Sequence, residues 1–257
     1  MLRACHAVTL LLPLLLAASV VFAAAPRQSG FDFMQPATQA LQRDDSQNPA
    51  MLWVKDGAAR WQARAGRANK SCAQCHGAAA KSMRGVAARY PTFSRALKQP
   101  VNLAQQINFC RTTRQQDHAL PLEHATLLGL ESFVALQSRG IKIAPPVDAR
   151  LAPARKQGEA LFNQRLGQID LSCKDCHDKL AGKSLAGNII PQAHPTGYPI
   201  YRLEWQGVGS LQRRLRNCLT GVRAEPYAPG SAEMIALEVY LAWRARGMLV
   251  ESPAVRP

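Results

Sequence analysis

Two short motifs in this chain place two cysteines and a histidine at a fixed spacing, C-x-x-C-H. The residues are Cys72, Cys75 and His76 in the first motif, and Cys173, Cys176 and His177 in the second. Two thiols at this spacing form thioethers with haem vinyl groups, and the adjacent histidine can ligate the iron. A thioredoxin-like redox pair or a zinc site is the alternative, but no β-α-β pattern surrounds either motif. The spacing therefore predicts two covalently bound c-type haems.

A second axial ligand for each iron must come from later in the sequence. Methionine is common in this role, but none lies between Met83 and Met234. Candidates after the first motif are Cys110, His118, His124 and Lys98. Met234 could serve the second motif, although it corresponds to Leu127, an apolar helix position of the first half, which favours a core position. Only cysteine occurs at corresponding places in both halves, so Cys110 and Cys218 are the favoured ligands, with His124 the best substitute in the first half.

The stretch 213–223 surrounds Cys218 with four arginines, Arg213, Arg214, Arg216 and Arg223. Cationic surroundings favour the thiolate, which is the form of cysteine that attacks electrophiles and binds metals. Cys110 has only Arg111 and Arg114 close by in the sequence. Because the arginines do not repeat as a set, we expect the chemistry to take place at the second motif and the first to be an electron site.

An internal repeat organises the elements that position these residues. Tyr90 and Tyr198, each followed by proline, stand 20 residues before Cys110 and Cys218, at an offset of 108 between the halves. Apolar residues at i and i+4 precede each cysteine at i+7, which predicts a short helix with the cysteine on its buried face. Asn102 and Ser210 are suitable N-caps. Two longer amphipathic helices, about 123–139 and 231–246, repeat at an offset of 107 and are expected to end at glycines.

We therefore predict a mostly α-helical chain of two tandem cytochrome c-like domains related by internal duplication. The expected division is a signal peptide at 1–25, the first domain at 26–144, a proline-rich linker at 145–153 and the second domain at 154–257. The polar residues 26–50 are expected to be a loop-rich arm.

The N-terminal residues also indicate where the protein is located. A short positive head, an apolar run from Val8 to Phe22 and an Ala-x-Ala-like end are typical of a secretory signal peptide, although an uncleaved anchor is the alternative. We expect a periplasmic protein with no membrane span after signal removal. In such a compartment a Cys110–Cys218 disulfide competes with ligation. The formal charge of +15 favours anions or an acidic protein partner, while nucleic acid is not expected for an exported chain.

With these residues assembled, the chain resembles the SoxA family, the haem subunit of the SoxAX L-cysteine S-thiosulfotransferase of sulfur-oxidising bacteria. The resemblance rests on Arg214-x-x-x-Cys218, the following residues 222–227 and the paired C-x-x-C-H motifs. It implies a dihaem member in which His76 with Cys110, and His177 with Cys218, are the axial ligands. It further implies that Cys218 can carry an extra sulfur as a persulfide and that Arg214 contacts the anionic substrate.

The resemblance also implies the reaction and the partners. Thiosulfate would be coupled oxidatively to a cysteine of a SoxYZ-like carrier, and electrons would pass to an acceptor cytochrome c. A small monohaem cytochrome resembling SoxX would form a heterodimer with this chain. The rival functions are a dihaem electron-transfer cytochrome without bond chemistry and a dihaem peroxidase, which would need an open iron and a catalytic acid.

Overall fold

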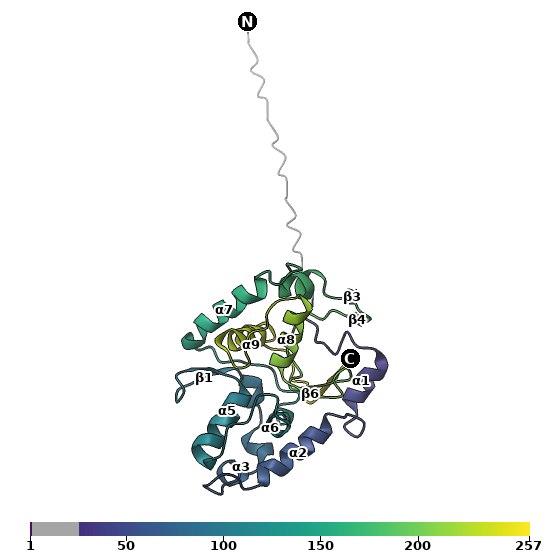
Figure 1. Cartoon of the computed structure of the whole chain (residues 1–257). Coiled ribbons are helices and arrows are strands. Elements are labelled where there is room, and N and C mark those ends of the chain that lie inside the picture. The colour runs from purple at the N-terminus through teal and green to yellow at the C-terminus, as the bar shows by residue number, and fades with distance from the viewer. Residues whose placement is uncertain (2–25) are drawn as a thin grey trace.

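The computed structural model of the chain describes Met1 and residues 26–257. The predicted signal peptide at 1–25 therefore lies, apart from Met1, outside the described residues. Within the described part, no helix is both long enough and apolar enough to cross a membrane. Helices from the first and the second half of the sequence form two neighbouring groups, with α2, α5 and α6 in one and α7, α8 and α9 in the other (Figure 1).

Both halves share an order of a helix before the motif, an antiparallel strand pair, the helix that bears the later cysteine and a long last helix, and the second half adds three further strands. The first half contains α1 (Pro36–Arg43), α2 (Met51–Gln62), α3 (Cys72–His76), α4 (Ala79–Ser82), η1 (Ala87–Arg89), β1 (Thr92–Ser94), β2 (Gln99–Val101), α5 (Leu103–Cys110), η2 (Arg111–Gln115) and α6 (Ala125–Leu136). The second half contains η3 (Ala149–Leu151), α7 (Ala152–Asn163), η4 (Asp175–Lys179), β3 (Ser184–Leu185), β4 (Asn188–Ile189), β5 (Ile200–Arg202), β6 (Gly207–Gly209), α8 (Leu211–Gly221), α9 (Ala232–Arg244) and β7 (Ala254–Arg256).

A close helix crossing forms the centre of each half. A Cβ added to Gly57 of α2 would lie 2.0 Å from the carbonyl oxygen of Gly129 in α6. A Cβ added to Gly158 of α7 would lie 2.0 Å from the carbonyl oxygen of Ala236 in α9. Only glycine permits such an approach of two backbones. The two halves therefore repeat the same crossing at corresponding residues.

The helices that carry Cys110 and Cys218 begin as predicted. In α5, Asn102 Oδ1 accepts a hydrogen bond from Gln105 N at 2.9 Å, and in α8, Ser210 Oγ accepts one from Arg213 N at 3.1 Å. Each helix follows an antiparallel hairpin, β1–β2 or β5–β6. Both N-cap predictions are thus confirmed.

The two longer helices of the repeat are present but shorter than expected. α6 ends at Leu136 and α9 at Arg244, and a further turn leads to Gly140 and Gly247. Both glycines have positive φ, +75° and +85°, the left-handed conformation that glycine adopts without steric cost. The glycines therefore end the turn after each helix rather than the helix itself.

Two elements depart from the expectations. The segment predicted as a loop-rich arm contains α1, which packs on β7, and Gln42 of α1 accepts a hydrogen bond from Val255 N at 3.1 Å. β7 itself pairs in parallel with β5, with Ile200 opposite Ala254, and completes a three-stranded sheet. Most of residues 26–50 is irregular, as expected, but the segment is attached to the fold through this one helix rather than extending from it. The segment expected as a linker also includes η3 and the start of α7.

Candidate active site

Both C-x-x-C-H motifs are held by a serine that precedes the first cysteine. Ser71 Oγ accepts a hydrogen bond from Gln74 N at 3.1 Å, and Gln74 Oε1 accepts one from Ser71 N at 2.9 Å. In the second motif, Ser172 Oγ accepts from Asp175 N at 3.2 Å, and Asp175 Oδ2 accepts from Ser172 N at 2.9 Å. These reciprocal bonds form a capping box. They hold the thiols and histidine of each motif in one short helical segment.

The histidines of the two motifs are oriented in different ways. His177 Nδ1 lies 2.7 Å from the carbonyl oxygen of Pro191. A carbonyl oxygen can only accept, so Nδ1 carries the proton and Nε2 keeps the lone pair that can ligate a metal. His76 is exposed and packs against Trp61, with ring centroids 5.7 Å apart, while Trp61 Nε1 donates to Gly77 O at 3.1 Å.

Cys218 lies on α8 beside His177 and two arginines. Burial is the strongest single influence on the Cys218 thiol and raises its pKa. Hydrogen bonding with His177 and the charges of Arg214, His177 and Arg202 act in the opposite direction, and the pKa is lowered from the usual cysteine value. The site therefore favours the thiolate, the form that ligates iron and attacks electrophilic sulfur.

Cys110 of the first half receives a hydrogen bond from a neutral amide. Gln106 Nε2 donates to Cys110 Sγ at 3.7 Å. Burial, followed by the nearby Cys110, raises the pKa of the Cys72 thiol, and burial followed by Cys218 raises that of Cys173 to about 11. Each later cysteine thus lies with its own motif. All six cysteines of residues 26–257 are free, so the alternative Cys110–Cys218 disulfide is not formed.

Apolar side chains line both sites in matching sets. Around Cys72 they are Trp61, Leu103, Ile107, Phe133 and Val134, and around Cys173 they are Phe162, Leu211, Leu215, Tyr240 and Leu241. A porphyrin needs apolar walls on both faces, two thiols at one edge and ligands above and below the iron. The residues of each half supply this combination, and they fit a covalently attached haem.

The arginines around Cys218 have different surroundings. Arg213 stacks over Trp205, 4.3 Å from the ring centroid, and Arg216 Nη1 donates to Tyr227 O at 2.6 Å. Arg223 is exposed. Arg214 is partly buried, and within residues 26–257 its guanidinium makes no hydrogen bond or ion pair. Among these four arginines, Arg214 is thus the one whose charge acts on Cys218 and whose guanidinium has no protein partner in that range.

Sequence reasoning missed two residues of this site, Tyr198 and Arg202. Burial raises the pKa of Tyr198 to about 12, while the neighbouring Arg214 opposes this rise. Arg202 is 9% exposed and its charge acts on Cys218. A signal for Arg202 was available, because the offset of 108 places it against Ser94 in the first half.

The other candidate ligands have structural roles. His124 is the N-cap of α6, where its Nδ1 accepts from Thr126 N at 3.2 Å. His118 is exposed, and Lys98 is exposed in the turn between β1 and β2. Met234 is fully buried within α9, at 0% exposure, as expected for a core residue. None of these side chains is brought to either motif in the way Cys110 and Cys218 are.

The sequence pattern of the family described as "SoxA/TsdA, cytochrome c domain" matches residues 56–143 and 157–250. The L-cysteine S-thiosulfotransferase subunit SoxA of Pseudaminobacter salicylatoxidans is 36% identical over 245 residues, covering 92% of this chain and 86% of that relative. The chain belongs to the SoxA family.

Other SoxA proteins and a solved structure agree with this assignment. SoxA of Rhodovulum sulfidophilum is 33% identical, covering 89% of this chain and 80% of its own length. The crystal structure of SoxXA from P. pantotrophus has a TM-score of 0.86 at 33% identity and covers 90% of this chain and 87% of that one. The fold is thus the SoxA form of the cytochrome c domain, a fold that carries covalently attached haem.

Proposed function

We propose that this chain is the haem-carrying SoxA subunit of an L-cysteine S-thiosulfotransferase. It couples thiosulfate to a cysteine of a carrier protein and releases electrons to a cytochrome c. The SoxA relatives bear this name. The observation that carries the proposal is Cys218, which lies beside His177 and under Arg214, an arginine without a protein partner in the described residues.

The cofactors are two covalently bound haems. Cys72 and Cys75 would hold the first and Cys173 and Cys176 the second, and haem iron supplies one-electron oxidation and reduction when bound. Axial ligation would come from His76 with Cys110 and from His177 with Cys218. The hydrogen bond from His177 Nδ1 to Pro191 O supports this arrangement, because it leaves Nε2 free to ligate.

The chemistry of the second half is the formation of a sulfur–sulfur bond. A carrier thiolate and thiosulfate combine to give a protein-bound S-thiosulfonate, and two electrons are released. Arg214 offers a planar set of N–H donors that matches the sulfonate oxygens and turns the outer sulfur toward Cys218. Cys218, as a thiolate or as its persulfide, forms a sulfur–sulfur bond to the outer sulfur, which keeps its sulfonate, and the two electrons leave at this step to the acceptor cytochrome c. The carrier thiolate then attacks that outer sulfur, the bond to Cys218 breaks, and Cys218 leaves in its original form.

The two halves are proposed to be tandem cytochrome c-like domains that arose by duplication, residues 26–144 and 154–257 joined by 145–153. The repeated helix crossings at Gly57 and Gly158 support this division. The two separate segments matched by the family pattern also support it.

The proposed partners are a SoxX-like monohaem cytochrome in a heterodimer, a SoxYZ-like carrier and an acceptor cytochrome c. The likeness to a SoxXA complex supports the first of these. Residues 1–25 would direct the chain to the periplasm and be removed. The basic surface, with a formal charge of +15 over the whole chain, suits thiosulfate and acidic partners.

Replacement of Cys218 tests the proposed function. In Cys218→Ala, thiosulfate-dependent reduction of cytochrome c should be abolished while both haems stay covalently bound by their thioethers. Cys110→Ala is the matched comparison, because it removes the corresponding sulfur from the electron site of the first half, and it should slow turnover without abolishing it. Normal turnover in Cys218→Ala would refute the role of this cysteine in the reaction.

A further inference from the structure

A second buried arginine lies in the neighbourhood of Cys218. Arg202 ends β5, and its side chain is 11% exposed. Its only ion pair within the described residues joins Nη2 to Glu204 at 2.8 Å, and the Glu204 side chain is itself 57% exposed. The Arg202 Nε is buried and has no hydrogen-bond partner in that part of the chain. A buried charged donor without an acceptor is unfavourable, so its placement calls for a ligand.

The surroundings of Arg202 fix its position. Its guanidinium lies over Trp205, 5.2 Å from the ring centroid, and Arg213 lies 4.3 Å from the same ring. β5 pairs with both β6 and β7, so the backbone that carries Arg202 is hydrogen-bonded on both sides. Arg202 is therefore a rigidly supported cation rather than a mobile surface side chain.

The first half of the chain provides an internal comparison. At the offset of 108, Ser94 stands in place of Arg202, and Gln106 stands in place of Arg214. Gln106 donates a neutral hydrogen bond to Cys110 Sγ at 3.7 Å, and Ser94 is buried. Both cations are thus absent from the half in which we propose no sulfur chemistry. The pair Arg202 and Arg214 is specific to Cys218, and the two charges act on each other as well as on the thiol.

We propose that Arg202 is a second substrate-binding residue, and that Arg202 and Arg214 together hold the sulfonate group of thiosulfate beside Cys218. This inference rests on the proposed function. A sulfonate has three oxygens that are not in one plane with each other and the fork of a guanidinium, and one planar guanidinium bonds two of them side by side, so a second arginine can bond the third. Two cations on one sulfonate leave the outer sulfur as the part of thiosulfate that points toward Cys218.

The test uses the haem-loaded SoxA-like chain in complex with its monohaem partner. Arg202→Gln should raise the KM for thiosulfate roughly tenfold or more, because a hydrogen bond to a charged group is lost. Its kcat should change much less. Arg202→Lys keeps the charge and should recover part of the affinity. Arg213→Gln is the matched control, since it removes the other charge that lies over the Trp205 ring, and should leave KM unchanged.

A haem carboxylate is the other anion that Arg202 could bind, and two readouts separate the cases. If Arg202→Gln shifts the Soret band or the reduction potential of the second haem while KM stays constant, the arginine pairs with haem and the inference is overturned. It is also overturned if neither KM nor the spectra change. Should the wild-type complex show no thiosulfate-dependent turnover, the proposed function itself fails. In that case, equilibrium binding of labelled thiosulfate still tests the role of Arg202. The affinity for thiosulfate should be weakened in Arg202→Gln, and to a lesser degree in Arg202→Lys.

Discussion

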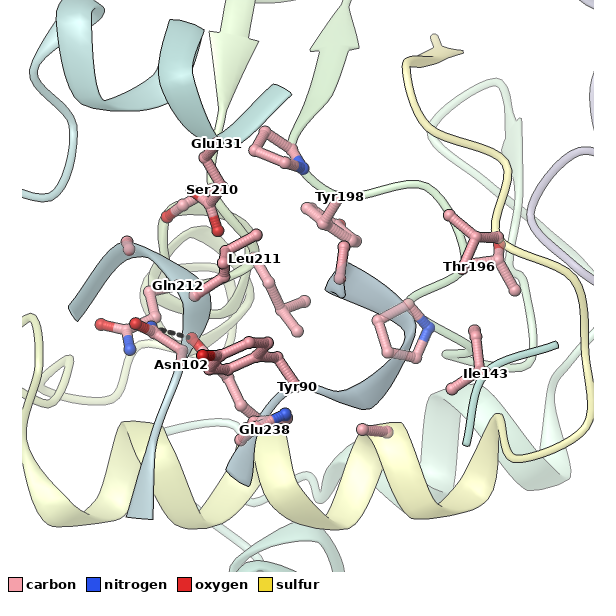
Figure 2. Close-up of a pocket in the computed structure, with 18 of the residues that line it drawn as sticks. Tyr90, Asn102, Glu131, Ile143, Thr196, Tyr198, Ser210, Leu211, Gln212 and Glu238 are labelled. Carbon is pink, nitrogen blue, oxygen red and sulfur yellow. Dashed lines mark hydrogen bonds between the residues drawn. The ribbon is translucent and has the colours of Figure 1, made fainter. Parts of the chain in front are cut away.

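Glu131 of α6 and Glu238 of α9 occupy equivalent positions and border the same cavity of about 110 Å³ between the two halves (Figure 2). Glu238 Oε1 accepts a hydrogen bond from Asn102 Nδ2 at 3.2 Å, whereas Glu131 Oε2 is buried without a partner among the described residues. Burial raises the pKa of Glu131 to about 8, with Glu238 and Glu123 adding to the effect, and burial raises the pKa of Glu238 to about 7. Both carboxyl groups therefore stay largely protonated up to about neutral pH.

This pair predicts a stability that falls as pH rises. The folded chain binds more protons than the unfolded chain at pH values above the ordinary glutamate pKa of 4.5, so the free energy of unfolding decreases from about pH 5 to pH 8. Glu238→Gln should flatten this dependence and stabilise the protein at pH 8 by about 1 to 3 kcal/mol. Thermal unfolding of both proteins at pH 5.5 and pH 8 measures the effect. If the stability of the wild type and of Glu238→Gln changed equally between the two pH values, the raised pKa of Glu238 would be contradicted.

The helix crossings predict a steric effect at two matched glycines. Gly57→Ala and Gly158→Ala each force a methyl group against a carbonyl oxygen and should lower the free energy of unfolding by about 1 to 3 kcal/mol or more. Gly221→Ala is the control, since a Cβ there meets nothing within 4 Å. In denaturant unfolding, the free energy of unfolding of Gly221→Ala should be close to that of the wild type. Tolerance of alanine at position 57 or 158 would show that the helices can separate without loss.

Substitutions at Arg214 and Arg216 should have opposite effects, although the two residues are only two positions apart in the sequence. Arg214→Gln removes a cation that has no partner among residues 26–257, so it should raise the thiosulfate KM and leave the melting temperature unchanged. Arg216→Gln removes the bond to Tyr227 O and should lower the melting temperature by about 2 to 4 °C with an unchanged KM. Steady-state kinetics and thermal melts of both variants decide the matter. An unchanged substrate dependence in Arg214→Gln would mean that another arginine binds the anion.

The proposed ligation of the two haem irons by Cys110 and Cys218 predicts a specific electron paramagnetic resonance spectrum. Both ferric haems should give low-spin thiolate signatures in electron paramagnetic resonance, and thiolate ligation should make them hard to reduce. Cys110→Ala should remove the signature of the first haem alone. A methionine–iron charge-transfer band would instead point to Met234, which the fold places in the core of α9.

The sequence predicted the residues whose pattern is local. The paired motifs, the N-caps Asn102 and Ser210, and the helices that end in or contain the later cysteines follow from spacing and periodicity. Strand β7 could not be predicted in this way, because its partner β5 lies some 50 residues earlier and the pairing is made by backbone groups common to all residues. Arg202 was missed because arginine is ordinarily a surface residue. Its burial depends on the tertiary position of β5 and Trp205.

The pairing of β7 with β5 has a consequence for how the protein should be handled. Arg202 lies directly opposite Arg256 in this pairing, and α1 in turn packs on β7. The strand that carries a proposed substrate-binding arginine is thus supported along one edge by residues 254–256, which are themselves covered by residues 36–43. Deleting residues 252–257, or attaching an affinity tag that disturbs them, would loosen β5. Such a preparation would bind thiosulfate poorly while its haem content remained normal.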